Sequence, residues 1–188
     1  MKVTTILGSP NKKGKTSAVL ALAEEKLIAQ GHEIDRIDVT NYQINGCLGC
    51  YSCMRNSDAA GCVQKDDADK VLNRITAADA VIYASPLYCF DLTAQMKPLI
   101  DRTFCLTNTA LLNGKWVAAL ITCAGPEEDN ADLVKGFFRR SFDGEHGGLF
   151  KTKLAGEFIV PFSNSTDFME RAENTANILS KAIISDEF

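Results

Sequence analysis

A loop that can bind an anion follows the first apolar run of the chain, Lys2 to Leu7. Its sequence is Gly8-Ser9-Pro10-Asn11-Lys12-Lys13-Gly14-Lys15-Thr16-Ser17, and a helical pattern continues from Ala18 to Gln30. A helix start leaves about four backbone N–H groups without partners and carries roughly half a positive charge, so it attracts phosphate. The loop therefore predicts a phosphate site near the N-terminus.

The spacing of this loop differs from that of an ATP- or GTP-binding P-loop. Five residues separate Gly8 from Gly14, whereas the nucleotide motif has four. Pro10 has no N–H to donate, and the hydroxyls of Ser9, Thr16 and Ser17 suit a single terminal phosphate better than a polyphosphate. No Mg-binding Asp ends a later strand. A nucleotide triphosphatase and a polar turn without a ligand are the alternatives.

Four of the seven cysteines form a second group with the spacing for chemistry. Cys47, Cys50 and Cys53 follow a Cys-x2-Cys-x2-Cys pattern, and Cys62 comes nine positions later. Three thiolates at this spacing can surround one centre, and a fourth completes a [4Fe–4S] cluster or a zinc site. Free thiols or an adventitious disulfide are the alternatives. The isolated Cys89, Cys105 and Cys123 are expected to be small buried apolar residues, Cys123 with a further possible place in a ligand pocket.

Composition limits the class of protein. The chain has 188 residues, 46% of them hydrophobic, and a net charge of −4 from 20 basic and 24 acidic side chains. We find no basic run for nucleic acid and no apolar stretch for a membrane, so a small-molecule partner is expected. The composition predicts a cytoplasmic protein with reduced thiols. We expect one domain over 1–188, with the cysteine-containing segment at 46–65 inserted after the second strand.

Short apolar runs alternate with helical patterns, which predicts a doubly wound α/β fold with a mostly parallel sheet. The expected strands are Val3 to Leu7, Glu33 to Val39, Ala80 to Ala84, Val117 to Thr122 and Gly156 to Val160. The expected helices are Thr16 to Gln30, Asp66 to Ala77, Thr93 to about Asn108, and a last helix capped by Asp167 with Glu170 reaching back. Ser141 to Lys153 is expected to be a mobile loop.

Ligands of open α/β sheets bind beyond the carboxyl ends of the strands, where the strand order reverses. Three loops should meet there. The first takes a phosphate, the second offers the apolar Pro86, Leu87 and Tyr88, and the third is small enough for its backbone to approach polar ring edges. The third loop contains Thr122, Cys123, Ala124 and Gly125. One terminal phosphate and a broad heteroaromatic ring are the features of FMN.

The chain resembles the flavodoxin-like NAD(P)H-dependent FMN reductase and iron-sulfur flavoprotein family. The matching segments are Leu7-Gly8-Ser9-Pro10 through Gly14-Lys15-Thr16, the cysteine segment, and Ser85-Pro86-Leu87-Tyr88 through Gln95-Met96-Lys97-Pro98-Leu99-Ile100-Asp101-Arg102. The resemblance implies a five-stranded parallel sheet of order 2-1-3-4-5. It also implies that Ser9, Thr16 and Ser17 hold the FMN phosphate and that Pro86 to Tyr88 pack on the isoalloxazine.

Three positions depart from the pattern of that family. Relatives often carry Arg at the position of Asn11 and Asn at that of Lys15, so the charge has moved along the phosphate loop; both residues remain expected cofactor contacts. Phe90 stands where relatives often have Gly, and it is expected to narrow access to the ring.

The resemblance implies an FMN-dependent oxidoreductase that uses NAD(P)H to reduce a quinone, a flavin or another small acceptor. FMN carries the hydride or single electrons, so no catalytic acid or base is assigned. The alternative is an iron-sulfur flavoprotein that passes single electrons between protein partners such as ferredoxin. A third hypothesis is a redox-sensing module whose cysteines respond to oxidants. Relatives suggest a homodimer or homotetramer in which a neighbour covers the flavin.

Overall fold

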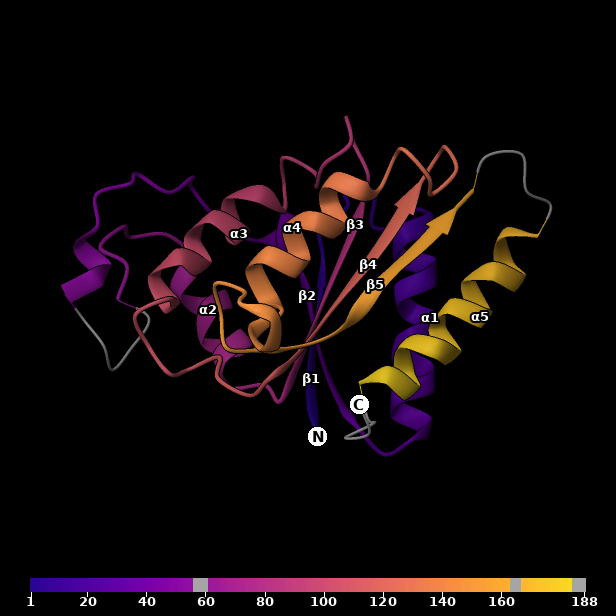
Figure 1. The fold of residues 1–188 in the computed structure, drawn as a ribbon, viewed down its shortest axis with the longest axis horizontal. Coiled ribbons are helices and arrows are strands. Elements are labelled where there is room, and N and C mark those ends of the chain that lie inside the picture. Colours follow the sequence, from indigo (N-terminus) through magenta and orange to yellow (C-terminus); the bar gives the residue numbers. More distant parts are fainter. Residues whose placement is uncertain (56–60, 163–166, 184–188) are drawn as a thin grey trace.

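A computed structural model describes residues 1–55, 61–162 and 167–183 and contains one five-stranded sheet. The strand order is β2-β1-β3-β4-β5 and every neighbouring pair is parallel, which confirms the flavodoxin-like fold (Figure 1). The strands are β1 (Lys2–Leu7), β2 (Glu33–Asp38), β3 (Ala80–Pro86), β4 (Trp116–Cys123) and β5 (Lys153–Pro161). The central β3 is buried along its whole length, as its continuous apolar run predicts.

Helices cover both faces of the sheet (Figure 1). They are α1 (Lys15–Ala29), α2 (Ala68–Thr76), α3 (Lys97–Arg102), α4 (Asp132–Phe142) and α5 (Phe168–Ala182). Alternate residues of β1 point to opposite faces, so Val3 and Leu7 pack with α1 and α5 while Ile6 packs with α2, α3 and α4. No helix in the described ranges is long and apolar enough to cross a bilayer.

The carboxyl ends of three strands are joined directly. The N–H of Gly8, just after β1, donates to the carbonyl of Ala84 on β3 at 2.7 Å, and the N–H of Leu87 donates to the carbonyl of Thr122 on β4 at 2.8 Å. Gly8 also lies against α3, because a Cβ built there would be 2.8 Å from both Cβ and Cε of Met96. Only glycine permits this close approach, which draws the first loop against the second.

The third predicted helix is shorter than expected. Residues 93–96 form a turn, α3 ends at Arg102, and a 3-10 helix, η3, covers Thr103–Leu106. The hydroxyl of Thr103 donates to the carbonyl of Ile100 at 2.6 Å, and that of Thr107 to the carbonyl of Phe104 at 2.8 Å. Threonine hydroxyls that bind nearby carbonyls compete with α-helical bonding, which explains the change to tighter turns.

Two other expectations are wrong. Ser141 to Lys153 contains the end of α4, a 3-10 helix at Gly144–His146, and a buried Phe150 whose ring stacks on Phe142 at 5.3 Å. The side chain of Asp167 makes no capping hydrogen bond to α5; it accepts from Nε of Arg171 at 2.7 Å instead. The helix α4 itself was not predicted.

Candidate functional site

Asn11 and Ser9 shape the predicted phosphate loop. Ser9 is buried, and its hydroxyl donates to the carbonyl of Asn11 and accepts from the Asn11 N–H, both at 3.1 Å. The Asn11 side-chain oxygen accepts from the N–H of Lys13 at 3.0 Å, and its carbonyl accepts from Gly14 N–H at 3.1 Å. These bonds close the loop on itself. Asn11 therefore acts on the form of the loop, whatever contact it makes with a ligand.

The start of α1 offers free donors beside a buried hydroxyl pair. Within the described ranges, the backbone N–H groups of Lys15, Thr16 and Ser17 have no hydrogen-bond acceptor, as expected of a first helical turn. The hydroxyl of Thr16 lies 2.7 Å from that of Thr122 at the end of β4, and both are buried. This contact brings the first and third predicted loops together. Three unpaired N–H groups next to a hydroxyl form a cradle that fits a phosphate.

Two other residues of the loop have partners outside it. The hydroxyl of Ser17 accepts from Nη2 of Arg36 on β2 at 2.8 Å, which leaves the Ser17 proton available to another acceptor. The ammonium group of Lys15 lies over two aromatic rings, 5.1 Å from the centre of Phe162 and 5.5 Å from that of Phe168. A cation held in this way contributes positive potential without a fixed ion pair.

The loop after β3 ends in a tight two-residue hairpin. Tyr88 and Asp91 exchange backbone hydrogen bonds at 2.9 and 3.1 Å, with Cys89 and Phe90 at the turn. Both turn residues have positive φ, 50° and 66°, a conformation that glycine or asparagine usually occupies. Tyr88 and Phe90 are about half exposed, whereas Pro86 is buried. The predicted apolar surface is therefore formed by the hairpin, and Cys89 is exposed, contrary to expectation.

The loop after β4 is compact. Cys123 is buried, burial raises the pKa of its thiol, and its Sγ lies 3.3 Å from the carbonyl of Gly125. A Cβ on Gly125 would lie 2.8 Å from the amide nitrogen of Asn130, so the small residue is required by packing. Ala124 is exposed between them. This arrangement keeps the third loop close to the carboxyl edge of the sheet.

The four clustered cysteines lie on a separate part of the molecule, between β2 and α2. Cys47 and Cys50 are exposed, Cys62 is half-buried, Cys53 is buried, and all four line one small cavity. Hydrogen bonds from Ser52 lower the pKa of Cys50. Among the described residues, no three Cys, His, Asp or Glu side chains are arranged to hold a metal ion. Residues 56–60, between Cys53 and Cys62, lie outside the description.

A buried arginine and a fifth thiol line the same cavity. Arg102 at the end of α3 has a side chain with 0% exposure, and its Nη1 donates to Asp66 Oδ2 at 2.7 Å. Its Nε and Nη2 have no partner in the part of the chain that is described. Cys105 is buried beside it, and burial raises the pKa of this thiol to about 12. Sulfur ligands with unpaired N–H donors fit an anionic sulfur cluster better than zinc, because cluster sulfides accept hydrogen bonds.

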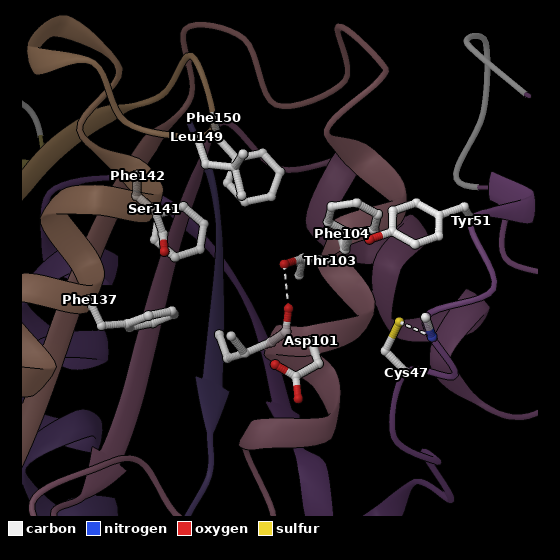
Figure 2. Close-up of a pocket in the computed structure, with 12 residues that line it drawn as sticks. Cys47, Tyr51, Asp101, Thr103, Phe104, Phe137, Ser141, Phe142, Leu149 and Phe150 are labelled. Atoms are coloured by element: carbon white, nitrogen blue, oxygen red, sulfur yellow. Dashed lines mark hydrogen bonds between the residues drawn. The ribbon is translucent and has the colours of Figure 1, made fainter. Parts of the chain in front are cut away.

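An aromatic pocket of about 400 Å³ separates this segment from α4. Figure 2 shows Phe137 and Phe142 of α4 on one side, Phe104 on the other, and Tyr51 beyond Phe104 towards the cysteine segment. The Tyr51 and Phe104 rings meet edge-to-face at 5.8 Å. Phe137 also lines a second pocket, of about 240 Å³, beside the Cys89–Phe90 turn. Apolar side chains thus connect the surroundings of the two predicted sites.

Sequence reasoning missed Arg102, Cys105 and the aromatic residues of α4. Ala131, Val134, Phe138 and Phe142 recur at three- and four-residue spacing and are buried, a pattern that would have revealed α4. Cys105 looked like any isolated buried thiol. The role of Arg102 had no local signal, because its partner Asp66 is 36 positions away.

The profile of a family described as NADPH-dependent FMN reductase matches residues 1–135. An iron-sulfur flavoprotein of Archaeoglobus fulgidus is 38% identical over 189 residues, which cover 98% of this chain and 81% of that protein. An NAD(P)H:quinone oxidoreductase of Methanothermobacter marburgensis has the same fold, with a TM-score of 0.69 at 20% identity over 97% of this chain and 96% of that one.

A second solved structure also shares the fold. It is an FMN-dependent NADH-azoreductase from Bacillus anthracis in complex with FMN, with a TM-score of 0.64 at 13% identity over 97% of this chain and 98% of that one. These likenesses agree with the sheet order and with the three loops at its carboxyl edge. The chain therefore belongs to the NADPH-dependent FMN reductase family and is a relative of the iron-sulfur flavoproteins.

Proposed function

We propose that the protein is an FMN-dependent oxidoreductase that takes electrons from NAD(P)H and gives them to a small acceptor such as a quinone or a free flavin. One observation carries this proposal. The unpaired N–H groups at the start of α1 lie beside the Thr16–Thr122 hydroxyl pair, at the same sheet edge as the exposed Tyr88–Asp91 hairpin. A phosphate site and an apolar platform at one edge suit FMN.

The residues of the chain bind and orient the cofactor. Lys15, Thr16 and Ser17 offer backbone N–H groups to the phosphate, and the hydroxyls of Ser9 and Thr16 stand beside them. The isoalloxazine is assigned to the hairpin, with Leu87 and Tyr88 against the ring. FMN, when bound, supplies hydride and single-electron transfer. Thr122, Cys123, Ala124 and Gly125 bring backbone groups to the polar edge of the ring.

The electron acceptor is assigned to the surface around Phe90. The side chain of Phe90 is about half exposed, and the pocket of about 240 Å³ next to it is lined by Leu92, Leu133 and Phe137. Apolar walls favour a flat, weakly polar acceptor over a highly charged one. Lys97 at the rim of this pocket forms an ion pair with Asp101, so the rim also has a polar side.

The test is anaerobic reduction of the purified full-length protein. The protein is expected to be yellow, or to become yellow with added FMN, and NADH or NADPH should bleach its absorption. Tyr88→Ala should weaken FMN binding, whereas Tyr42→Ala, far from the sheet edge, should not. A colourless protein that does not take up FMN contradicts the proposal.

A second candidate function is electron transfer through a [4Fe–4S] cluster held by Cys47, Cys50, Cys53 and Cys62. It is supported by the one cavity that the four thiols share and by the unpaired N–H groups of Arg102 in the wall of that cavity. The cluster, when bound, exchanges single electrons. Ferredoxin is the partner class that such chemistry suits.

Cysteine variants test this second function. Anaerobically purified protein should contain about four irons and four sulfides per chain. Cys50→Ser should remove most of them and leave FMN bound, while the matched variant Cys89→Ser, which also changes an exposed thiol, should not alter the iron content. Iron and sulfide that survive Cys50→Ser unchanged count against the cluster.

A cytoplasmic location, a single domain over 1–188 and a homodimer or homotetramer remain predictions. Reducing conditions suit a protein with four clustered thiols. The exposed Tyr51 and Leu149 at the aromatic pocket would be covered in an oligomer. Light scattering of the purified protein measures its size directly.

A further inference from the structure

Arg102 has more hydrogen-bond donors than partners, although its side chain is fully buried. Its Nη1 donates to Asp66 Oδ2 at 2.7 Å and to the carbonyl of Asn45 at 3.1 Å. Nε and Nη2 donate to no atom of the described residues. An unpaired buried donor destabilises a fold, and a charged one does so more strongly. The free donors therefore need an acceptor that the polypeptide alone does not provide.

Asp66 cannot provide that acceptor. Its carboxylate already accepts from the N–H of Asn45 at 2.9 Å and from the N–H of Ala68 at 3.0 Å, besides Nη1 of Arg102. Burial raises the pKa of Asp66, but these hydrogen bonds outweigh it and lower the pKa to about 2, so the carboxylate is charged. Asp66 is tied to the starts of α2 and the cysteine segment, and it fixes one end of the guanidinium.

The other end of the guanidinium lies in the wall of the cysteine cavity. Arg102 and all four clustered cysteines line this cavity, together with Cys105. The sulfurs are the acceptors in reach of a side chain held in this place. Thiolate and sulfide atoms of a metal cluster are anionic, so hydrogen bonds from a guanidinium to them are charge-assisted.

We propose that Arg102 is a positioning residue for the cysteine-bound group and that its Nε–H and Nη2–H donate to sulfur atoms of that group. The inference rests on the [4Fe–4S] cluster of the second proposed function. The positive charge and the two donors stabilise the reduced cluster more than the oxidised one, because the reduced cluster is more negative. Arg102 thus raises the reduction potential and slows the loss of iron.

The test compares Arg102→Lys with Arg74→Lys in the full-length protein, reconstituted anaerobically with iron and sulfide. Lysine keeps the charge and the ion pair with Asp66 but loses the two extra donors. Arg74 is the matched control, because it pairs with Asp35 on the far side of α2 and all its nitrogens have partners. We expect reduction to become at least tenfold less favourable in Arg102→Lys, about 59 mV for one electron, and to be unchanged in Arg74→Lys.

A second measurement does not depend on the stability of a variant. Wild-type protein grown with 15N-arginine is reduced, and pulsed electron paramagnetic resonance records coupling between the cluster spin and nearby 15N nuclei. Side-chain 15N coupling that disappears in the unlabelled protein supports the proposal. Absence of that coupling, together with an unchanged potential in Arg102→Lys, overturns the role of Arg102. A wild-type chain that takes up no iron and sulfide overturns the cluster itself, and leaves the FMN proposal standing.

Discussion

The hydroxyl pair of Thr16 and Thr122 makes the sharpest prediction, because it separates stability from cofactor binding. The two oxygens lie 2.7 Å apart, and the side chains are 3% and 1% exposed. If Thr122 donates to Thr16, the Thr16 proton is left for the FMN phosphate. Thr16→Val removes that donor and leaves the Thr122 hydroxyl unpaired, whereas Thr122→Val leaves the Thr16 donor in place.

The magnitudes follow from the burial of both groups. In the protein without FMN, each single variant should lower the unfolding free energy by about 1–3 kcal/mol, while the double variant should lower it by less than the sum. A hydrogen bond to a charged group contributes about 1.5–3 kcal/mol, so Thr16→Val should weaken FMN binding roughly 10- to 150-fold. Thr122→Val should weaken it much less, and Thr16→Ser should restore binding.

The assays are urea denaturation of the apoprotein for stability and fluorescence titration with FMN for affinity. Riboflavin serves as the control ligand, since it lacks the phosphate and its affinity should not change in Thr16→Val. Two results would refute the reasoning: additive stability losses in the double variant, or wild-type FMN affinity in Thr16→Val.

Three further outcomes are expected. Gly8→Ala should lower the unfolding free energy by about 1–3 kcal/mol in urea denaturation, because the new Cβ would lie 2.8 Å from two atoms of Met96; an unchanged midpoint would contradict the packing. Phe90→Gly should be more stable than Phe90→Ala by about 1 kcal/mol, since φ is 66° at this position, and it should speed the reduction of bulky acceptors. The pKa of Asp66 is about 2 in the folded protein and 3.8 as the reference value, so its carboxylate contributes about 2 kcal/mol above pH 4 that is lost as the pH falls towards 2; Asp66→Asn should show no such loss in acid unfolding curves.

The sheet could be predicted because its strands are short apolar runs, such as Ala80 to Ala84, separated by stretches too long for hairpins. The extent of α3 could not, because the stripe from Met96 to Phe104 fits one long helix. Its conversion to 3-10 turns depends on where the Thr103 and Thr107 hydroxyls point. Spacing alone does not record that choice.

The phosphate loop was predicted from its residue types, but the partner of each side chain was not. Lys15 faces Phe162 and Phe168, and Ser17 accepts from Arg36, contacts that cross the sheet edge from distant parts of the chain. The cysteine spacing predicted a shared centre, and the structure adds Arg102 to its wall. Long-range pairing between buried groups is the information that local patterns lack.

The central claim is that one anionic phosphate is bound at the start of α1 by the loop from Ser9 to Ser17. Its most direct measurement is the affinity of the purified protein for FMN compared with riboflavin, at constant pH and salt. FMN should bind at least 100-fold more tightly than riboflavin, a difference of about 2.8 kcal/mol. Equal affinity for the two flavins, or no binding of either, would contradict the account.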